Sequence, residues 1–163
     1  MPELELVTER LVLVLQSPEN LRRKITSLPA EVKKELSLQW LQLVENAKKA
    51  DPWIHGFDVT LKTTRAPIGQ AGFKSPPNED GVVEIAYGID ELHQGNGYAT
   101  EATLGLTSFA LEQANVRKVR AHTLPQENAS TKVLRKCKFI KIDEVEDPDD
   151  GPVWRWEYQP KRA

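Results

Sequence analysis

The sequence predicts a mixed α/β domain with one central twisted sheet of about six to seven strands, flanked by four helices. Segments with alternating apolar residues are interleaved with segments of helical periodicity along the whole chain. The strand–helix–strand unit over residues 82–124 is a crossover, which predicts two parallel neighbouring strands. A length of 163 residues suits a single domain covering residues 1–163.

The composition is that of an ordinary globular protein, with 39% hydrophobic and 28% charged residues. A net charge of -2 does not predict a nucleic-acid surface. No apolar run approaches the roughly 20 residues of a membrane span, and the acidic opening MPELELVTERL is unlike a signal peptide. The single cysteine, Cys137, excludes an internal disulfide. These features fit a cytoplasmic protein.

In the first third of the chain we expect one strand and two helices. Residues 4–16 alternate and are rich in Leu and Val, which predicts a strand. Ser17 and Pro18 form a helix start, and this helix is expected to run to about residue 27. A second, longer helix opens at Pro29 and ends at Asp51-Pro52. Its apolar stripe comprises Leu36, Trp40, Leu43, Val44 and Ala47.

The rest of the chain alternates between strands and helices. Two prolines and an Asp-Gly pair predict a loop over residues 75–81. A helix is expected to follow the glycines near residue 95, because Ala99, Ala102, Leu106, Phe109 and Ala110 share one face. The expected strands are 53–64, 66–74, 82–89, 117–124, 139–146 and 153–159, and the expected helices run to about residue 114 and over 127–136.

The stretch LHQGNGYATEA, residues 92–102, places two glycines where a helix should start. A helix N-terminus leaves backbone N–H groups without partners and carries partial positive charge, so it favours an anion. Gly95 and Gly97 lack a Cβ and can take positive φ, while Asn96 tolerates the left-handed region. Gln94 offers a further donor. The alternative is a tight strand-to-helix turn without a ligand.

Two common phosphate-binding motifs are absent. There is no G-x-x-x-x-G-K-[ST], which argues against a nucleoside triphosphatase. The dinucleotide-binding pattern lacks its third glycine, and the following strand ends in His122-Thr123-Leu124 instead of an acidic residue.

The glycine stretch resembles the signature of a known family. Gln94-Gly95-Asn96-Gly97-Tyr98-Ala99 is similar to the Q/R-x-x-G-x-G/A motif of the GNAT superfamily of acetyl-CoA-dependent N-acetyltransferases. The branch that acetylates the N-termini of ribosomal proteins is similar in three further segments. These segments are Thr8-Glu9-Arg10-Leu11, Glu84-Ile85-Ala86-Tyr87-Gly88-Ile89, and Leu124-Pro125 through Asn128-Ala129-Ser130 to Lys136-Cys137-Lys138-Phe139.

The resemblance implies a GNAT-like sheet in which a parallel pair of strands splays apart to admit CoA. It assigns acetyl-CoA binding to the strand end and the glycine loop, at Tyr87, Gly88, Ile89, Gln94, Gly95, Asn96, Gly97, Tyr98, Ala99 and Thr100, and to Asn128. Two departures concern local geometry. Lys138 replaces a glycine that the family usually has before the phenylalanine, and Asn128 lies two residues before Ser130 where the family spacing is three.

Direct attack by an amine on a thioester requires a neutral amine, because free amines are mostly protonated at neutral pH. Glu84 is the candidate general base, since alternation places it on the small-residue face of its strand. We expect partial desolvation to raise its pKa. The alternative is a strand glutamate that is paired with an arginine or faces water. His55 and His122 are competing bases that are more often structural residues.

The other catalytic roles come from the resemblance. Backbone N–H groups at Tyr87 to Ile89 would stabilise the developing oxyanion, with Gly88 leaving room for the acyl chain or marking a β-bulge. Ser130 is the first candidate to protonate the leaving thiolate, and Tyr87 is the second. Ser130 is equally a candidate helix cap.

Three further features favour structural interpretations. Trp154, Trp156 and Tyr158 alternate and are expected in the core, with a wall of the acceptor site as the alternative. The acidic run over residues 143–150 is expected to be a solvated hairpin loop, although it could attract a cationic acceptor. Cys137 is expected to be a small core residue. No metal site is expected.

The sequence therefore predicts an N-acetyltransferase that transfers the acetyl group of acetyl-CoA to a primary amine. A protein N-terminus is the first acceptor hypothesis, by branch resemblance, and a small amine or aminoglycoside-like molecule is the second. A non-catalytic acetyl-CoA sensor is an alternative of a different class. No nucleic-acid or membrane partner is expected, and the oligomeric state is open between monomer and homodimer.

Overall fold

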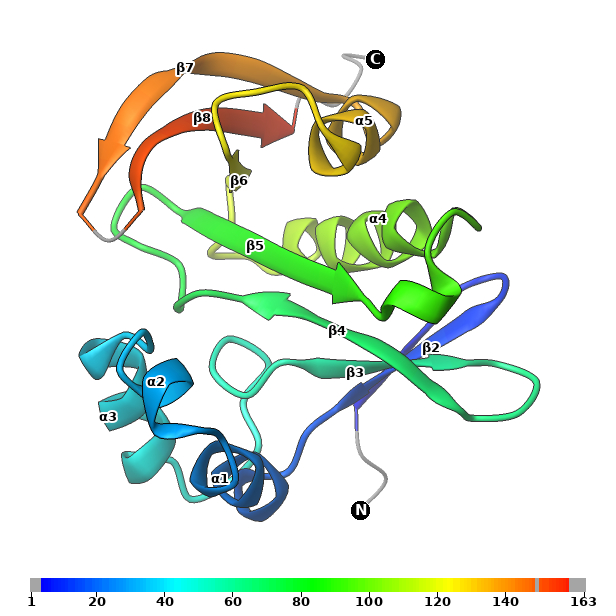
Figure 1. Ribbon diagram of the computed structural model, residues 1–163, viewed down its shortest axis with the longest axis vertical. Helices are drawn as coiled ribbons and strands as arrows, with labels where there is room; N and C mark the ends of the chain where they lie inside the picture. The colour runs from blue at the N-terminus through cyan, green and yellow to red at the C-terminus, as the bar shows by residue number, and fades with distance from the viewer. Residues whose placement is uncertain (1–3, 149, 159–163) are drawn as a thin grey trace.

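A computed structural model describes residues 4–148 and 150–158. They form an eight-stranded sheet in the order β1-β2-β3-β4-β5-β6-β8-β7 (Figure 1). All neighbouring strands are antiparallel except β5 and β6, which are parallel as predicted. The mixed α/β class and the single central sheet are confirmed.

The strands and helices follow the predicted order with two additions. The strands are β1 Glu5–Val7, β2 Leu11–Leu15, β3 Phe57–Leu61, β4 Pro67–Phe73, β5 Val82–Ile89, β6 Lys118–Thr123, β7 Phe139–Asp147 and β8 Gly151–Tyr158. The helices are α1 Pro18–Thr26, α2 Ala30–Lys33, α3 Leu38–Asn46, α4 Tyr98–Leu111 and α5 Ala129–Lys136, with a 3-10 turn at Glu91–His93. The described residues contain no helix that is long and apolar enough to cross a membrane.

The prediction of one strand over residues 4–16 is wrong. The chain folds into the antiparallel hairpin β1–β2, with its turn at residues 8–10. Thr8 closes this turn, because its backbone N–H donates to the Leu11 carbonyl at 2.9 Å. No glycine or proline marks the turn in the sequence. Its anchor is Glu101 of α4, which accepts the Arg10 backbone N–H at 2.7 Å.

The predicted long helix after Pro29 is two short helices. α2 buries none of its side chains, so no tertiary packing holds a continuous helix through residues 34–37. Ser37 then starts α3, since its hydroxyl accepts the Trp40 backbone N–H at 3.2 Å. α3 ends at Asn46, before the predicted Asp51. The strand expected from residue 53 starts at Phe57, because the Ile54 and His55 N–H groups donate to the Asp51 carbonyl and form a turn.

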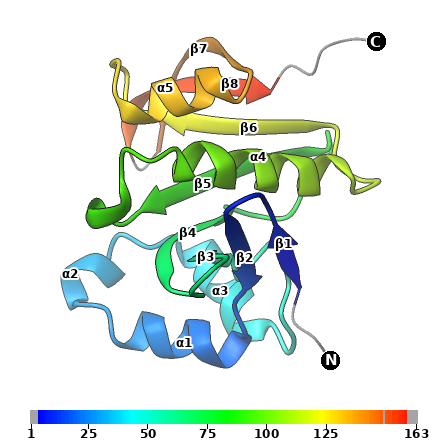
Figure 2. The same ribbon diagram turned by 90° about the vertical axis from the view of Figure 1, so that its right-hand side faces the viewer.

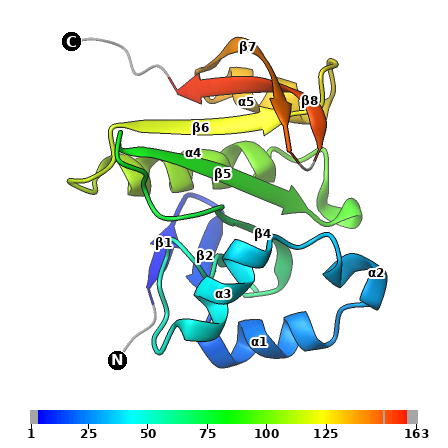
Figure 3. The same ribbon diagram turned by 90° about the vertical axis from the view of Figure 1, so that its left-hand side faces the viewer.

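The helices cover the two faces of the sheet differently. Helices α4 and α5 lie on one face, and α1, α2 and α3 lie on the other face, near β2–β4 (Figures 2 and 3). Within residues 4–148 and 150–158, no helix covers the face of β5, β6 and β8 opposite α4 and α5 (Figures 2 and 3). The main core lies between the sheet and α4; it includes Leu11, Leu13, Phe57, Val83, Ile85, Ala102, Leu106, Val119 and Trp156.

Several sequence interpretations of core residues are confirmed. Trp156 is 1% exposed, and Trp154 and Tyr158 pack against the core. Cys137 is fully buried, and burial raises the pKa of its thiol to about 11, which makes it a poor nucleophile. These side chains therefore serve packing.

Lys138 joins α5 to β7 with a φ of 71°, in the left-handed region. A Cβ at this φ costs about 1–2 kcal/mol, and a glycine would avoid that cost while losing more entropy on folding. We therefore expect Lys138→Gly to raise the free energy of unfolding by about 0.5–1 kcal/mol in urea denaturation. The control is Lys132→Gly inside α5, expected to lower stability by about 1 kcal/mol. A loss of stability in Lys138→Gly would contradict the strain argument.

Candidate active site

The parallel strands β5 and β6 separate after three residue pairs. Their pairing runs from Val82↔Lys118 to Glu84↔Arg120 and stops there. Beyond this point β5 stays paired with β4 as far as Ile89, and β6 stays paired with β8 as far as Thr123. The gap opens at the carboxyl ends of both parallel strands, directly before the glycine loop.

Main-chain donors of β5 point into this gap. The Glu84 carbonyl accepts from the Lys74 N–H at 2.9 Å and the Asp90 N–H donates to Ile68 at 2.8 Å, so even-numbered residues of this strand face β4. By alternation, the N–H groups of Tyr87 and Ile89 face the gap. Gly88 was predicted as a donor with them, but its N–H faces β4.

Gly88 instead leaves space on the face that carries Glu84. A Cβ built there meets no atom within 4 Å, and the register with β4 is continuous, so the residue is not a bulge. The space beside this part of the strand is thus unoccupied by protein atoms, and the role of Gly88 in admitting the acyl chain stays a prediction.

The glycine loop presents an uncapped helix N-terminus. Gly95 and Gly97 have φ of 81° and 82°, and Gly97 is the N-cap of α4 without any side-chain cap. α1, α3 and α5, in contrast, are capped by Ser17, Ser37 and Asn128. The N–H groups at the first turn of α4 thus remain available to an anion.

The side chains of the loop brace its shape. The Asn96 amide donates to the His93 carbonyl at 3.1 Å, and the Gln94 amide donates to the Ile89 carbonyl at 2.8 Å. Gln94 was predicted to donate to the anion, but this N–H instead ties the loop to the end of β5. Tyr98, Ala99 and Thr100 form the first turn of α4, and all three are half-buried.

Arg10 fixes the loop from outside. Its guanidinium donates to the Asn96 carbonyl at 2.9 Å and to Glu101 at 2.8 Å, and it lies over the Tyr98 ring at 4.6 Å. Thr8 donates its hydroxyl to the same Glu101 carboxylate. The sequence singled out the Thr8–Leu11 segment but gave Arg10 no role. The β1–β2 turn is therefore part of the glycine loop's support.

Glu84 lies at the last pair before the gap, with a 23% exposed side chain. One carboxylate oxygen, Oε2, lies 2.9 Å from His122 Nδ1 and 3.0 Å from Lys74 Nζ. These contacts are ion-pair distances without the alignment of a hydrogen bond, which leaves Oε2 buried and without an aligned donor among the described residues. The predicted placement of Glu84 on the small-residue face is confirmed.

The predicted rise in the pKa of Glu84 is wrong. Burial does favour the neutral carboxyl, but His122 and Lys74 together hold the pKa of Glu84 below its usual value. Burial also disfavours the charged Lys74, whose pKa is nevertheless raised because Glu84 lies beside it. Both groups are thus ionised at neutral pH, and Glu84 enters any reaction as a carboxylate.

The two candidate acids lie near each other at the start of α5. The Tyr87 hydroxyl donates to the Ser130 carbonyl at 3.4 Å, and burial raises the pKa of Tyr87 to about 12. Ser130 is not the helix cap, since the Asn128 side chain accepts the Thr131 N–H at 3.0 Å. The acceptor oxygen of Asn128 is thereby used in the cap, and only its amide N–H groups remain for a ligand.

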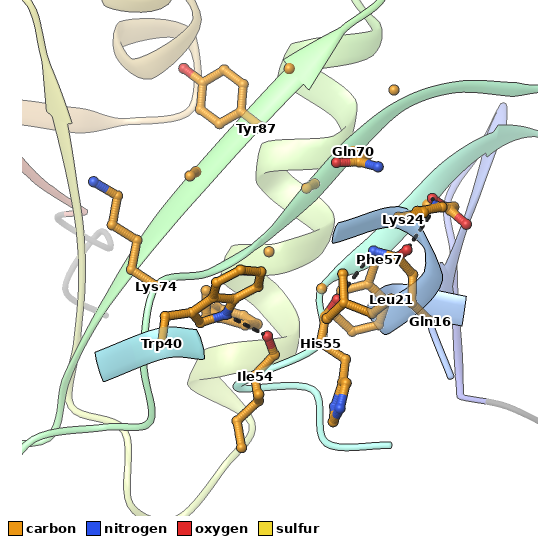
Figure 4. Close-up of a pocket in the computed structure, with 18 of the residues that line it drawn as sticks. Gln16, Leu21, Lys24, Trp40, Ile54, His55, Phe57, Gln70, Lys74 and Tyr87 are labelled. Carbon is orange, nitrogen blue, oxygen red and sulfur yellow. Dashed lines mark hydrogen bonds and ion pairs between the residues drawn. The ribbon is translucent and has the colours of Figure 1, made fainter. Parts of the chain in front are cut away.

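A cavity of about 1050 Å³ adjoins β4 and β5 on the face away from α4. Lys74 and Tyr87 lie at one side and Gln16 and Lys24 at the other (Figure 4). The acidic side chains of its wall come from separate elements: Glu35, Asp58, Glu84, Asp90, Asp147 and Asp150. The acidic β7–β8 turn, for which the sequence favoured a solvated loop and kept attraction of a cationic acceptor as the alternative, borders the cavity through Asp147 and Asp150.

The far end of the cavity is fixed by polar contacts. Gln16 donates to the His55 carbonyl at 3.1 Å and accepts from Lys24 at 2.7 Å, and Lys24 pairs with Asp58 at 2.8 Å. His55 is 1% exposed, and its Nδ1 accepts the Asp51 N–H at 2.9 Å. This contact gives His55 a structural role in the turn before β3.

The sequence analysis missed Lys74, Arg155 and Lys24 as site residues. Lys74 follows β4, and Arg155 of β8 donates to His122 Nε2 at 3.1 Å. Lysines and arginines on strands carry no motif, so only the sheet order could have brought them to Glu84. Among the described residues, no group of three or more His, Cys, Asp and Glu side chains could hold a metal ion.

The geometry agrees with a family assignment. The sequence model of the acetyltransferase (GNAT) domain matches residues 6–140. The chain belongs to the GNAT acetyltransferase family. This match covers the splayed strands and the glycine loop.

Curated relatives of this GNAT domain carry acetyltransferase names. The uncharacterized N-acetyltransferase p20 of Bacillus licheniformis is 32% identical over 85 residues, which is 52% of this chain and 48% of that protein. The uncharacterized N-acetyltransferase YjdG of Bacillus subtilis is 32% identical over 100 residues, 60% of this chain and 57% of that protein. The matches thus span about half the length of these relatives.

Solved structures share the fold at low sequence identity. A protein described provisionally as a ribosomal-protein-serine acetyltransferase of Vibrio cholerae has a TM-score of 0.70 and 17% identity, over 98% of this chain and 99% of that one. AAC(6')-Ib in complex with ribostamycin and coenzyme A has a TM-score of 0.64 and 17% identity, over 92% and 93% of the two chains. These similarities establish the fold.

The Glu101 tie predicts pH-dependent stability. Burial raises the pKa of Glu101, but Thr8 and Arg10 lower it more, so its folded pKa lies below its usual value. The ionised form therefore stabilises the fold above about pH 4.3, and this contribution is lost as the pH falls. We expect Glu101→Gln to cost about 1 kcal/mol near neutral pH, allowing for screening at the half-exposed Arg10.

Urea denaturation followed by tryptophan fluorescence measures this difference at several pH values. The difference in the free energy of unfolding between wild type and Glu101→Gln should become smaller as the pH falls below about 4.3. Glu112→Gln, at the exposed C-terminal end of α4, is the control. A difference in the free energy of unfolding that stays constant into the acid range would argue against a stabilising role of the ionised Glu101 carboxylate.

Proposed function

We propose that this GNAT domain is an acetyl-CoA-dependent N-acetyltransferase that acts on a primary amine by direct attack in a ternary complex. The observation that carries the proposal is the gap between β5 and β6, which opens from Glu84 toward the uncapped start of α4. A single ligand with a diphosphate at one end and a thioester at the other fits this arrangement. Acetyl-CoA supplies the activated acetyl group.

The coenzyme end of the site would be formed by main-chain groups. The N–H groups of residues 95–100 are suited to a diphosphate, because Gly95 and Gly97 keep Cβ atoms away and orient the amides. The N–H groups of Tyr87 and Ile89 face the gap and are suited to the acyl and pantetheine part. One of them would stabilise the negative charge that develops on the thioester oxygen. The amide of Asn128 lies at the start of α5 as a further donor.

The amine end of the site would be governed by Glu84. As a carboxylate it can bind the acceptor ammonium, which loses one proton to solvent to become the neutral nucleophile. Glu84 can then take the second proton as the carbon–nitrogen bond forms and the nitrogen becomes more acidic. Its low pKa favours passing that proton on to solvent. Tyr87, protonated at neutral pH, can donate to the leaving thiolate; Ser130 is the alternative donor.

We infer that the acceptor is a cationic amine, because six acidic side chains border the cavity against the two lysines Lys24 and Lys74. A protein N-terminus is the first candidate, supported by the resemblance to the ribosomal-protein branch and by the description of the Vibrio cholerae neighbour. A small amine is the second, supported by the acid-lined cavity and by the ribostamycin complex of AAC(6')-Ib. A cytoplasmic location would supply acetyl-CoA to either reaction.

The activity is tested by the release of free CoA thiol from acetyl-CoA with a panel of N-terminal peptides, polyamines and aminoglycosides. An enzyme releases thiol and forms an acetylated amine that mass spectrometry detects. Acetyl-CoA binding by calorimetry without turnover on any acceptor would instead support the sensor. The absence of both acetyl-CoA binding and turnover would overturn the proposal.

Glu84→Gln is expected to lower kcat by about 10²-fold or more, since a positioned base contributes roughly that much. The affinity for acetyl-CoA should stay close to that of the wild type, because the coenzyme contacts lie on main-chain groups. In the pH–rate profile of the wild type, the apparent pKa of the acidic limb should lie below the usual pKa of a glutamate. The variant should lack this limb. Normal turnover by Glu84→Gln would remove Glu84 from the mechanism.

Gly97→Val is expected to weaken acetyl-CoA binding at least tenfold. Valine is strained at a φ of 82°, and a Cβ there lies 3.3 Å from the Arg10 guanidinium. Gly81→Ala is the control, because it adds a Cβ at a φ of 76° near Arg117, at the opposite end of β5. Isothermal titration calorimetry on both variants should show the loss only at Gly97.

A further inference from the structure

His122 lies where the sheet opens. It follows Arg120, the last residue of β6 that pairs with β5, by two positions, and its side chain is on the same face of the sheet. Its ring is 14% exposed and stands between the carboxylate of Glu84 on β5 and the guanidinium of Arg155 on β8. Side-chain contacts through this ring therefore link β5 to β6 and β8 just beyond the last residue pair between β5 and β6.

The two ring nitrogens have different partners, and this defines the tautomer. Arg155 is always a donor, and its Nε donates to His122 Nε2 at 3.1 Å, so Nε2 must be an unprotonated acceptor. The hydrogen of a neutral ring then resides on Nδ1, which lies 2.9 Å from Glu84 Oε2. The ring thus carries its single N–H on the edge that lies 2.9 Å from Oε2, an electrostatic contact without the alignment of a hydrogen bond.

In the part of the chain that the structure describes, the ion-pair contacts of the Glu84 carboxylate are made by one of its two oxygens. His122 and Lys74 both approach Oε2, from β6 and from the end of β4. The charged groups on the elements around this pair are Arg120, Arg155, Glu157, Asp147 and Asp150. Oε1 has no such ion-pair contact among the described residues.

We propose that His122 is a positioning residue for the transfer reaction, in which Arg155 fixes the Nδ1–H tautomer and the electrostatic contact of this polar ring edge with Oε2 holds the Glu84 carboxylate with Oε1 presented to the acceptor amine. This inference rests on the proposed function. His122 itself exchanges no proton with the substrate. A neutral asparagine amide can replace the Nδ1–H donor, whereas a phenylalanine of similar shape cannot.

The kinetic test compares His122→Phe with His122→Asn. His122→Phe should lower kcat about tenfold with an unchanged KM for acetyl-CoA, and the acidic limb of the rate profile should move to higher pH because Glu84 loses a donor. His122→Asn should recover most of the rate and return the limb toward its wild-type position. Thr123→Val is the control for lost stability, because Thr123 accepts from Trp156 Nε1 at 3.0 Å away from Glu84.

If the acidic limb of the pH–rate profile does not move in His122→Phe, or if the rate does not recover in His122→Asn, His122 has a packing role and the proposal is overturned. A second measurement is independent of turnover. Nitrogen-15 shifts of the histidine rings, assigned with the His122→Asn variant, should show the Nδ1–H tautomer near neutral pH and its loss in Arg155→Met. The Nε2–H tautomer in wild type would refute the positioning role even if acetyl transfer is found, whereas absence of transfer with the Nδ1–H tautomer would count against the proposed function alone.

Discussion

The separation of β5 from β6 is the constraint on which the rest of the site depends. Parallel strands normally continue their hydrogen bonds, yet these two stop at Glu84↔Arg120 while each remains paired on its outer side. As a result, main-chain donors of β5 are left without a partner strand, and the side chains beside the gap become accessible. The Lys74–Glu84–His122–Arg155 chain crosses the opening and keeps the strands in a defined relation.

The helix that follows β5, α4, also starts with main-chain N–H groups that have no side-chain cap. Where the other long helices satisfy their first N–H groups with serine or asparagine, α4 starts at a glycine in the left-handed region. The strand and the helix thus offer two sets of main-chain donors, separated by the 3-10 turn at Glu91–His93 and the glycine loop. An extended anionic ligand such as a coenzyme suits two separated sets of donors better than a compact phosphate.

Local signals in the sequence predicted the parts of the site that local sequence determines. The bounds of β5, the parallel pair, the positive φ of Gly95 and Gly97 and the face of Glu84 all follow from alternation, crossover length and glycine placement. The β1–β2 turn escaped prediction because its anchor, Glu101, is 91 residues from Arg10. The pKa direction of Glu84 failed for a related reason, since Lys74 and His122 reach it from neighbouring strands.

The hydrogen bonds from Arg10 to Asn96 and Glu101 couple the conformation of the N-terminal hairpin to that of the glycine loop. Opening of the hairpin would release the Asn96 carbonyl and free the loop to change conformation. A ligand that stiffens the loop would, by the same linkage, slow amide exchange in β1 and β2 without touching either strand. Amide exchange in the first strands of the chain would thus report whether a ligand occupies the glycine loop.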